Sequence, residues 1–498
     1  LASADVLVVL LDQTLTGGQQ THRALGQSDD YVQRAIKAAG FTGKMGQCVD
    51  LIAPQGFDLS RLVLVGTGNG TDLGVNGQAI RLGGIVAGYL EGLACASATV
   101  LIEGETTRAL GASGFGEFVA GMRLRSYRWS RRTDAEPAAL KSVTLAVDAP
   151  DAVAAQMTYG HALSDGVAIA RDLVNEAPNY LGTVEFAAAA QQLAPLGVKV
   201  EILTEVEMAA LGMNGILAVG QGSRRPPRLA VLSWMGAGKA EAPVALVGKG
   251  MVFDTGGLCL KPAADQPAMK ADMAGAAAVF GTLKCLALRK AAVNVVGILA
   301  IAENMPGGNA WRPSDIVTSM SGRTLEIIDT DYEGRVVLAD ALWYCQDRIK
   351  PRAMIDLATL TGSIVAALAS KRAGLFSNDD TLANDLFRAG EQTEERLWRF
   401  PMGSDYAVEI KSDVADLRTT AGDAGDTIFG AQFLECFVNG TVWAHLDISG
   451  PAIPSAPTDV NSEWSSTSDN EFCRSWAPGY GVRLLDRLIR NAFEKHES

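Results

Sequence analysis

Acidic and basic side chains gather in two glycine-punctuated segments of this 498-residue chain, Val247–Gly257 and Asp329–Arg335. The charged residues in and near these segments are Lys249, Asp254, Lys261, Asp272, Asp331, Glu333 and Arg335. Carboxylates packed this densely beside apolar strands are costly to bury unless positive charge neutralises them. Divalent metal ions take oxygen ligands, and two ions would use this many, so the sequence predicts a dinuclear metal centre.

The first carboxylates follow an apolar strand. Val244–Val247 has the continuous apolar character of a buried strand, and Gly248–Gly257 is expected to form the loop after it. In open α/β sheets ligands bind at the carboxyl ends of strands, which is where this interpretation places Asp254. Asp272 directly precedes a helix-forming run, and the helix dipole there would favour its ionised form.

Asp331 and Glu333 follow a second expected strand, Thr324–Ile328. In an extended segment a spacing of two puts both side chains on one face, where they converge on one ion or an ion pair. Glu333 or Asp254 would suit a bridging position between two metals. Taken singly, such residues are more typical of a solvated loop, but seven charged residues beside apolar strands favour a shared site.

The basic residues suggest three different tasks. A lysine beside dications can lose its proton and bind a metal through nitrogen, whereas a lysine that stays charged would stabilise an oxyanion on a substrate carbonyl. Lys249 and Lys261 are the candidates, although Lys249 alone could also be a phosphate-loop or surface lysine. Arg335 cannot deprotonate and would bind an anion or carboxylate through two hydrogen bonds.

Other motifs are weaker. Leu62–Gly70 contains GxGxG in place of the GxGxxG of dinucleotide sites, so a tight turn after a strand is the preferred interpretation. GxSxG and HExxH are absent, and His445 inside an apolar run is expected to be a core histidine. The seven cysteines are scattered without a CxxC pair, which predicts free thiols in a reducing compartment, and with four histidines any metal must be held mainly by oxygen.

Length and composition predict a two-domain α/β protein. The 48% hydrophobic and 20% charged residues are typical of a globular chain, and the net charge of −13 argues against nucleic acid or anionic membranes as partners. The N-terminus lacks the basic region of a signal peptide, so we expect a cytoplasmic protein.

We expect a smaller N-terminal α/β domain at 1–150, a connecting helix at 151–178, and at 179–498 a larger catalytic α/β domain, whose central mixed sheet is flanked by helices. The expected strands are Val6–Leu11, Arg61–Val65, Ala98–Ile102, Ser142–Val147, Lys199–Leu203, Leu229–Trp234, Val244–Val247, Val293–Ala300, Thr324–Ile328, Ala353–Leu357 and Val442–Asp447.

From about residue 170 onward the chain resembles the cytosolic leucyl aminopeptidase family of dinuclear metallo-exopeptidases. Asp329–Leu338 is similar to the family signature Asn-Thr-Asp-Ala-Glu-Gly-Arg-Leu-Val-Leu, and Val247–Asp272 matches its other metal-binding segment. Further agreement lies in Ala170–Asn179, Val219–Ser223, Glu303–Ala310, Asp356–Gly362 and Trp443–Ile448. The chain departs from the signature at Asp329 and Tyr332, which replace Asn and Ala; neither is a side-chain ligand position.

The resemblance implies a role for each charged residue. One metal would be bound by Lys249, Asp254, Asp272 and Glu333, and the other by Asp254, Asp331 and Glu333. Lys261 would polarise the scissile carbonyl. Arg335 would hold a bicarbonate that acts as general base toward a metal-bridging water, and this water would attack the carbonyl. The cofactors would be two divalent ions per subunit (Zn, Mn or Mg) and bicarbonate.

The resemblance also implies the substrates and the assembly. The substrates would be peptides with free N-termini, and a homohexamer is implied. The specificity pocket maps onto Met269, Thr359, Gly362, Ser449 and Ala452. Met and Thr walls favour a Leu- or Met-type residue. Two alternatives stay open: a dinuclear hydrolase of another amide or a phosphoester, and a non-catalytic binding or structural protein on the same scaffold.

Overall fold

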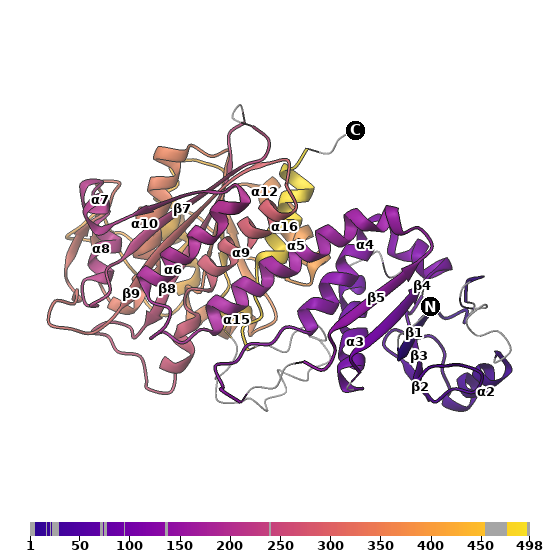
Figure 1. The fold of residues 1–498 in the computed structure, drawn as a ribbon. Coiled ribbons are helices and arrows are strands. Elements are labelled where there is room, and N and C mark those ends of the chain that lie inside the picture. The colour runs from indigo at the N-terminus through magenta and orange to yellow at the C-terminus, as the bar shows by residue number, and fades with distance from the viewer. Residues whose placement is uncertain are drawn as a thin grey trace. The chain divides into compact units, whose positions relative to one another are not determined.

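The computed structural model describes residues 5–495, except 16, 20, 22–28, 70–72, 74–76, 94, 135–137, 239–240 and 454–475. The chain divides into two compact units between Ser164 and Asp165, inside helix α5 (Pro150–Asn175). Each unit has a sheet with helices packed against it, so the predicted two-domain α/β architecture is confirmed (Figure 1).

The first unit has a five-stranded sheet in the order β2-β3-β1-β4-β5, in which only β2 runs antiparallel to its neighbour among the described residues. Its elements are β1 (Val6–Leu11), α2 (Asp29–Ala39), β2 (Cys48–Ile52), β3 (Arg61–Gly66), α3 (Gln78–Gly92), β4 (Ser97–Ile102), α4 (Gly104–Arg125) and β5 (Ser142–Val147). The sequence predicted all these strands except β2. That edge strand is only partly buried and contains Asp50, so it lacks a continuous apolar run.

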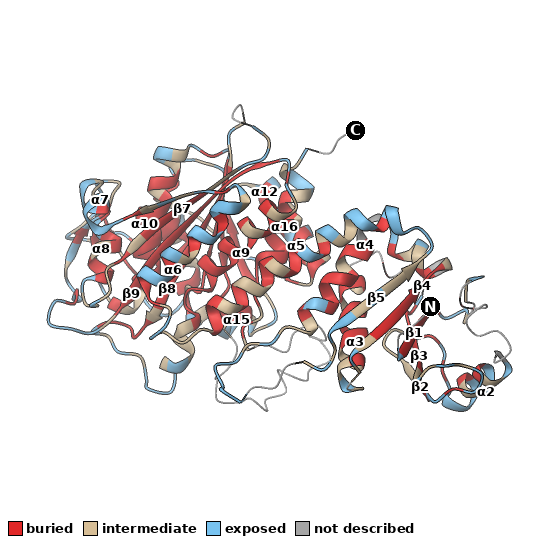
Figure 2. Ribbon diagram, in the orientation of Figure 1, coloured by how far each residue is buried: buried red, intermediate tan, exposed pale blue. Residues whose placement is uncertain are grey.

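Strand β1 shows why this sheet is covered on both faces. Successive side chains of a strand point to opposite faces, so an apolar strand feeds two cores. Val8 and Leu10 pack into one core with residues of α3 and α4, whereas Val9 and Leu11 pack into another with residues of α2. The strand is therefore buried along its whole length, as expected of parallel sheets with helices on both faces (Figure 2).

The second unit has an eight-stranded mixed sheet in the order β14-β13-β16-β12-β8-β9-β7-β6. Its strands are β6 (Lys199–Leu203), β7 (Arg228–Met235), β8 (Val244–Asp254), β9 (Asn294–Asn304), β12 (Ala353–Ala358), β13 (Ala373–Ser377), β14 (Leu397–Arg399) and β16 (Trp443–Asp447). The four central strands β16, β12, β8 and β9 are parallel, so their carboxyl ends share one edge. A small second sheet contains β10 (Ile316–Thr318), β11 (Thr324–Glu326) and β15 (Leu417–Arg418).

The helices of this unit pack against the large sheet or against one another (Figure 1). They are α6 (Thr183–Ala189), α7 (Glu205–Ala210), α8 (Asn214–Gly220), α9 (Ala274–Leu288), α10 (Glu333–Tyr344), α11 (Gly362–Leu368), α12 (Asp380–Thr393), α13 (Ser404–Ala407), α14 (Asp426–Glu435), α15 (Ser449–Ala452) and α16 (Val482–Leu488). Among the described residues, one stretch, Gln266–Leu288, is long and apolar enough to cross a membrane. Because 89% of its apolar window is buried inside the protein, it is typical of a core helix.

The predicted loop at Gly248–Gly257 was wrong over most of its length, because β8 continues to Asp254. Its continuation pairs with β9 as far as Asn304, with an irregular register between Met251 and Phe253. The pairing with β9 satisfies the backbone N–H and C=O groups of this segment. The glycine-rich sequence alone does not indicate such a pairing. As a result, Lys249 lies within the sheet and is buried.

Glycines let α9 approach β8 and β12 at backbone distance. A Cβ on Gly248 would lie 2.4 Å from the Cα of Ala276, and a Cβ on Gly275 would lie 2.1 Å from the carbonyl oxygen of Leu357. Any side chain at either position would therefore push the helix off the sheet. The close contact brings Asp272, two residues before the start of α9, toward the middle of β8.

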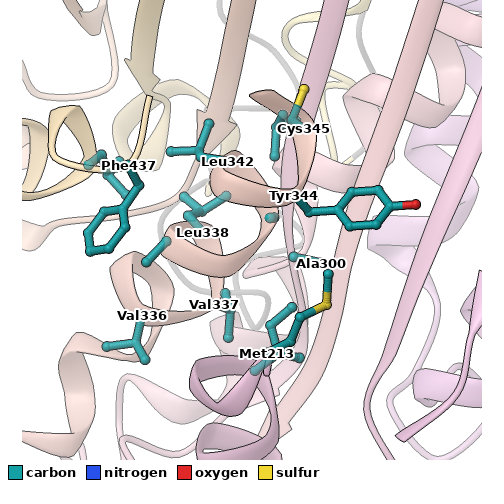
Figure 3. Close-up of a cluster of buried hydrophobic side chains, with 14 of the residues drawn as sticks. Met213, Ala300, Val336, Val337, Leu338, Leu342, Tyr344, Cys345 and Phe437 are labelled. Carbon is teal, nitrogen blue, oxygen red and sulfur yellow. The ribbon is translucent and has the colours of Figure 1, made fainter. Parts of the chain in front are cut away.

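Helix α10 is anchored in a large apolar core of this unit. Figure 3 shows Leu338, Leu342 and Val337 of this helix among buried side chains of the same cluster, with Phe437 and Met213 from other segments. Since α10 begins at Glu333, this packing also fixes the position of a predicted metal ligand.

Leu338→Ala is expected to lower the free energy of unfolding by about 2–5 kcal/mol, because the fully buried side chain leaves a cavity that the core cannot fill. Urea unfolding followed by near-UV circular dichroism measures the change. Leu260→Ala is the matched control, since that side chain is 57% exposed and its loss should cost less than about 0.5 kcal/mol. Equal effects of the two substitutions would contradict this view of the core.

Candidate metal centre

The carboxyl ends of the central parallel strands carry the site. Lys249 and Asp254 belong to β8, Asn304 ends β9, Thr359 follows β12, and Asp447 ends β16. Parallel strands place these ends at one edge of the sheet, so residues far apart in sequence become neighbours.

Lys249 lies between two buried carboxylates. Its Nζ is 2.9 Å from Oδ2 of Asp272 and 2.7 Å from Oε1 of Glu333, and it donates a 2.8 Å hydrogen bond to the carbonyl oxygen of Thr359. Gly334 preserves this room, since a Cβ there would lie 2.7 Å from Cε of Lys249. The predicted neighbours Lys249, Asp272 and Glu333 therefore meet in the structure.

Lys261 lies between the other two carboxylates. Its Nζ is 2.9 Å from Oδ2 of Asp254 and 2.5 Å from Oδ1 of Asp331. The chain reaches this position through Gly256, whose φ of +87° permits the turn after β8. Asp254 is held from the other side, because its Oδ1 accepts hydrogen bonds from the backbone N–H of Gly256 at 2.9 Å and from Nδ2 of Asn304 at 2.8 Å.

The extended conformation expected for Asp331 and Glu333 was wrong. Asp331 lies in a 3-10 turn, Thr330–Tyr332, and Glu333 is the first residue of α10. Asp329 stabilises the turn by accepting a 2.7 Å hydrogen bond from the backbone N–H of Asp331. The turn still brings both side chains to the site, but through helical geometry instead of strand alternation.

Charge is unbalanced in this cluster. Four carboxylates (Asp254, Asp272, Asp331 and Glu333) face two ammonium groups (Lys249 and Lys261), which leaves two negative charges in a largely buried space. Burial, followed by the charges of Glu333 and Asp254, raises the pKa of Asp331 to about 7. Burial likewise raises the pKa values of Asp272 and Glu333, although Lys249 opposes this in both cases.

The two lysines show the reciprocal effect. Burial lowers the pKa of Lys249, but the carboxylates of Asp272 and Glu333 outweigh it, and the pKa rises above its ordinary value. The pKa of Lys261 is raised in the same way, with burial opposed chiefly by Asp254 and Glu333. A dication among the same carboxylates would act on both lysines in the opposite direction.

The carboxylates have the arrangement of a cation site. Asp254, Asp272 and Glu333 are all buried, and each offers an oxygen within 4.8 Å of the others. Oε2 of Glu333 is buried and has no hydrogen-bond partner among the described residues. Divalent ions of the hard and borderline classes accept such oxygen ligands, and one such ion would balance the two excess negative charges. The residues present therefore fit divalent metal ions.

Arg335 is buried in the first turn of α10. Its Nη1 donates a 2.6 Å hydrogen bond to the carbonyl oxygen of Thr419, and its Nη2 lies 2.8 Å from Oδ1 of Asp426. The ring of Tyr332 stacks on the guanidinium, with 4.5 Å between Cζ and the ring centroid. Within the part of the chain that the structure describes, Nε has no hydrogen-bond partner, so this guanidinium keeps a donor for another group.

The predicted pocket residues come from three segments. Thr359 is buried beside the centre and donates a 2.6 Å hydrogen bond to Oδ1 of Asp272, whereas Gly362 is exposed at the start of α11. Ser449 and Ala452 are buried at the two ends of α15, a helix that contacts α11. Met269 is half-buried, one turn before Asp272.

Sequence reasoning missed Asn304 and Asp447 as site residues. Asn304 links Asp254 to the carbonyl oxygen of Thr330, and its own Oδ1 accepts a hydrogen bond from Nε1 of Trp311. A polar residue at the carboxyl end of an apolar strand was the available signal for both. His445, expected in the core, is buried with its Nδ1 2.6 Å from Oδ1 of Asp356.

Comparison with known proteins identifies the family. The model of the cytosol aminopeptidase family, catalytic domain, matches residues 168–485, and the model of its N-terminal domain matches residues 7–134. A probable cytosol aminopeptidase of Allorhizobium ampelinum is 50% identical over 468 residues, covering 93% of this chain and 91% of the relative. One of a Bradyrhizobium species is 46% identical over 500 residues, covering 99% of this chain and 97% of the relative.

Solved structures agree. The bottromycin maturation enzyme BotP in complex with Mn is 31% identical and covers 98% of this chain and 99% of that one, with a TM-score of 0.82. A mutant of tomato leucine aminopeptidase is also 31% identical, with a TM-score of 0.81, and covers 98% of this chain and 94% of its own. With its buried carboxylates at the sheet edge, the chain thus belongs to the cytosol aminopeptidase family and is a metal-dependent aminopeptidase that acts on peptides.

Proposed function

We propose that Lys249, Asp254, Asp272 and Glu333 bind one divalent ion, and that Asp254, Asp331 and Glu333 bind a second. The observation that carries the proposal is the group of three buried carboxylates within 4.8 Å of one another, flanked by two lysines. When bound, the two ions supply an activated water for attack on the scissile carbonyl and a position for the substrate's free amine. Zn, Mn and Mg are the proposed metals.

Two basic residues perform the other steps. Lys261 is less deeply buried than Lys249, with 17% of its side chain exposed, so it can reach a substrate carbonyl and stabilise the negative charge that develops on its oxygen. Arg335 keeps a buried Nε that no described residue accepts from, which fits an anion such as bicarbonate. Arg335 would hold this anion, which would supply a general base for the attacking water.

The pocket selects the N-terminal side chain of the substrate. Met269, Thr359, Gly362, Ser449 and Ala452 are its proposed lining. Their side chains are small or apolar, which suits a Leu- or Met-type residue better than a charged one. We also propose that the protein acts in the cytoplasm as a homohexamer, which analytical ultracentrifugation would test.

Hydrolysis of leucine and methionine amides tests the reaction and the preference together. The metal-free protein, reloaded with Zn, Mn or Mg, should cleave both amides faster than glycine or glutamate amides. N-acetylated substrates should not be cleaved, because the amine is blocked. Cleavage of N-acetylated amides or of a phosphoester at comparable rates would favour a different dinuclear hydrolase.

Arg335→Lys is expected to lower kcat by roughly a hundredfold, because an ammonium group cannot keep the contacts with Thr419 and Asp426 and also supply the donor that Nε offers. In carbon dioxide-free buffer the wild-type protein should lose activity and recover it when bicarbonate is added, whereas the variant should respond weakly. Arg312→Lys is a control, since that side chain is exposed. An undiminished bicarbonate response in Arg335→Lys would remove Arg335 from this role.

A further inference from the structure

We propose that Asp447 is a positioning residue for the aminopeptidase reaction. Its carboxylate is fully buried at the end of β16, and it joins three segments that carry proposed site residues. The inference rests on the proposed roles of Lys249, Asp272 and Arg335. In this role, Asp447 holds the three segments in fixed positions relative to one another.

The first segment is the loop between β12 and α11. Oδ1 of Asp447 accepts a 3.1 Å hydrogen bond from the backbone N–H of Leu360, and Oδ2 accepts one of 2.6 Å from Oγ1 of Thr361. The preceding residue, Thr359, bonds to Lys249 through its carbonyl oxygen and to Asp272 through its hydroxyl. A shift of this loop would therefore move two proposed metal ligands.

The second segment is the start of α14. Oδ2 of Asp447 accepts a 3.3 Å hydrogen bond from Oγ1 of Thr427. Thr427 directly follows Asp426, which pairs with Arg335 at 2.8 Å. The Asp447 carboxylate thus holds both the loop that contacts the proposed metal ligands and the helix start that carries Asp426, the partner of Arg335.

The third segment is the proposed substrate pocket. Oδ1 of Asp447 accepts hydrogen bonds from the backbone N–H of Ser449 at 3.3 Å and from its hydroxyl at 3.0 Å. These contacts fix the start of α15, where the pocket floor is proposed. All five donors are neutral, and a carboxylate buried among neutral donors costs more than an apolar residue of similar size. A buried carboxylate at this position is therefore better explained by its hydrogen bonds to three site segments than by a contribution to the stability of the core.

Asp447→Asn tests the role, because it keeps the shape but turns one acceptor into an amide that faces other donors. We expect kcat to fall by roughly ten- to a hundredfold and KM for leucine amide to rise, as for residues that orient metal ligands. Asp340→Asn is the matched control. Asp340 is also fully buried and accepts backbone hydrogen bonds, from Met320 at 2.7 Å and Ile216 at 3.0 Å, but those partners lie outside the proposed site.

A purely structural role predicts that both variants lose stability and that neither changes kcat or KM in the folded fraction. That result would overturn the inference. If Asp447→Asn does not fold, Thr427→Val is measured in its place, since it removes only the hydroxyl. Loss of one hydrogen bond should lower kcat roughly two- to tenfold and weaken the bicarbonate response. Unchanged kinetics in Thr427→Val would count against the inference.

Glu333→Ala, measured in parallel, separates this inference from the proposed function. If Glu333→Ala is inactive while Asp447→Asn retains wild-type kcat and KM, only the positioning role fails. If Glu333→Ala remains active, the proposed site itself is misplaced, and the positioning role fails with it.

Discussion

Glu333→Ala should lose both tightly bound metal and turnover. Glu333 lies beside both other buried carboxylates of the group, with one oxygen within 4.8 Å of an oxygen of Asp254 and of Asp272. Its Oε1 pairs with Lys249, and its Oε2 has no hydrogen-bond partner in the described parts of the chain. Removing it deletes an oxygen ligand proposed for both ions and half of the excess negative charge. The remaining carboxylates then have little net charge with which to hold two dications.

Metal analysis after dialysis and hydrolysis of leucine amide measure the two effects on the same sample. Glu326→Ala is a suitable control, since that glutamate hydrogen-bonds Ser412 at 2.6 Å in the same unit and belongs to no proposed site. The control should keep its metal and its rate. A Glu333→Ala protein that turns over at the wild-type rate would show that the site is misassigned.

The fold could be predicted from the sequence where strands are continuously apolar. β1, β4 and β12 lie within a residue of their predicted bounds, because buried parallel strands carry their own signal in composition. β2 and the short strands β10 and β14 could not be predicted. Each has few buried residues, and pairing with a neighbour decides its conformation.

Residue types and approximate positions of the site were also predictable, but not their local conformations. The glycines at 248 and 250 suggest a loop when read alone. In the structure they are needed because α9 and β9 pass at backbone distance from β8. Residues 248–250 alone do not indicate that α9 and β9 pack so closely on β8. For this reason Lys249 was expected on a loop, although it lies inside a strand.

Contacts between distant segments explain what else was missed. Asn304 and Asp447 end strands that are far apart in sequence, and their partners become neighbours only when β9, β8, β12 and β16 assemble. Their side chains organise ligands without belonging to the acidic motifs. Predicted roles of individual residues, the pocket lining and the domain boundaries at 150 and 178 stay predictions until they are tested.

Lys261→Ala should separate metal binding from catalysis. Lys261 is proposed to stabilise the developing negative charge on the substrate oxygen, and removing one such donor typically costs about a hundred- to a thousandfold in kcat. Metal should be retained or bound more tightly, because Lys261 now neutralises Asp254 and Asp331 at 2.9 Å and 2.5 Å. Its loss raises the excess negative charge of the centre from two to three.

The metal and hydrolysis assays used for Glu333→Ala also apply to Lys261→Ala. Glu333→Ala should lose both metal and rate, whereas Lys261→Ala should lose only the rate. Lys199→Ala, at a side chain that is 79% exposed, controls for the general loss of a positive charge. Lys261→Arg should restore part of the rate, since it returns a cation of similar reach but different geometry. A Lys261→Ala protein that loses metal in proportion to activity would mean that Lys261 acts on the assembly of the centre, and the carbonyl would then need another cation.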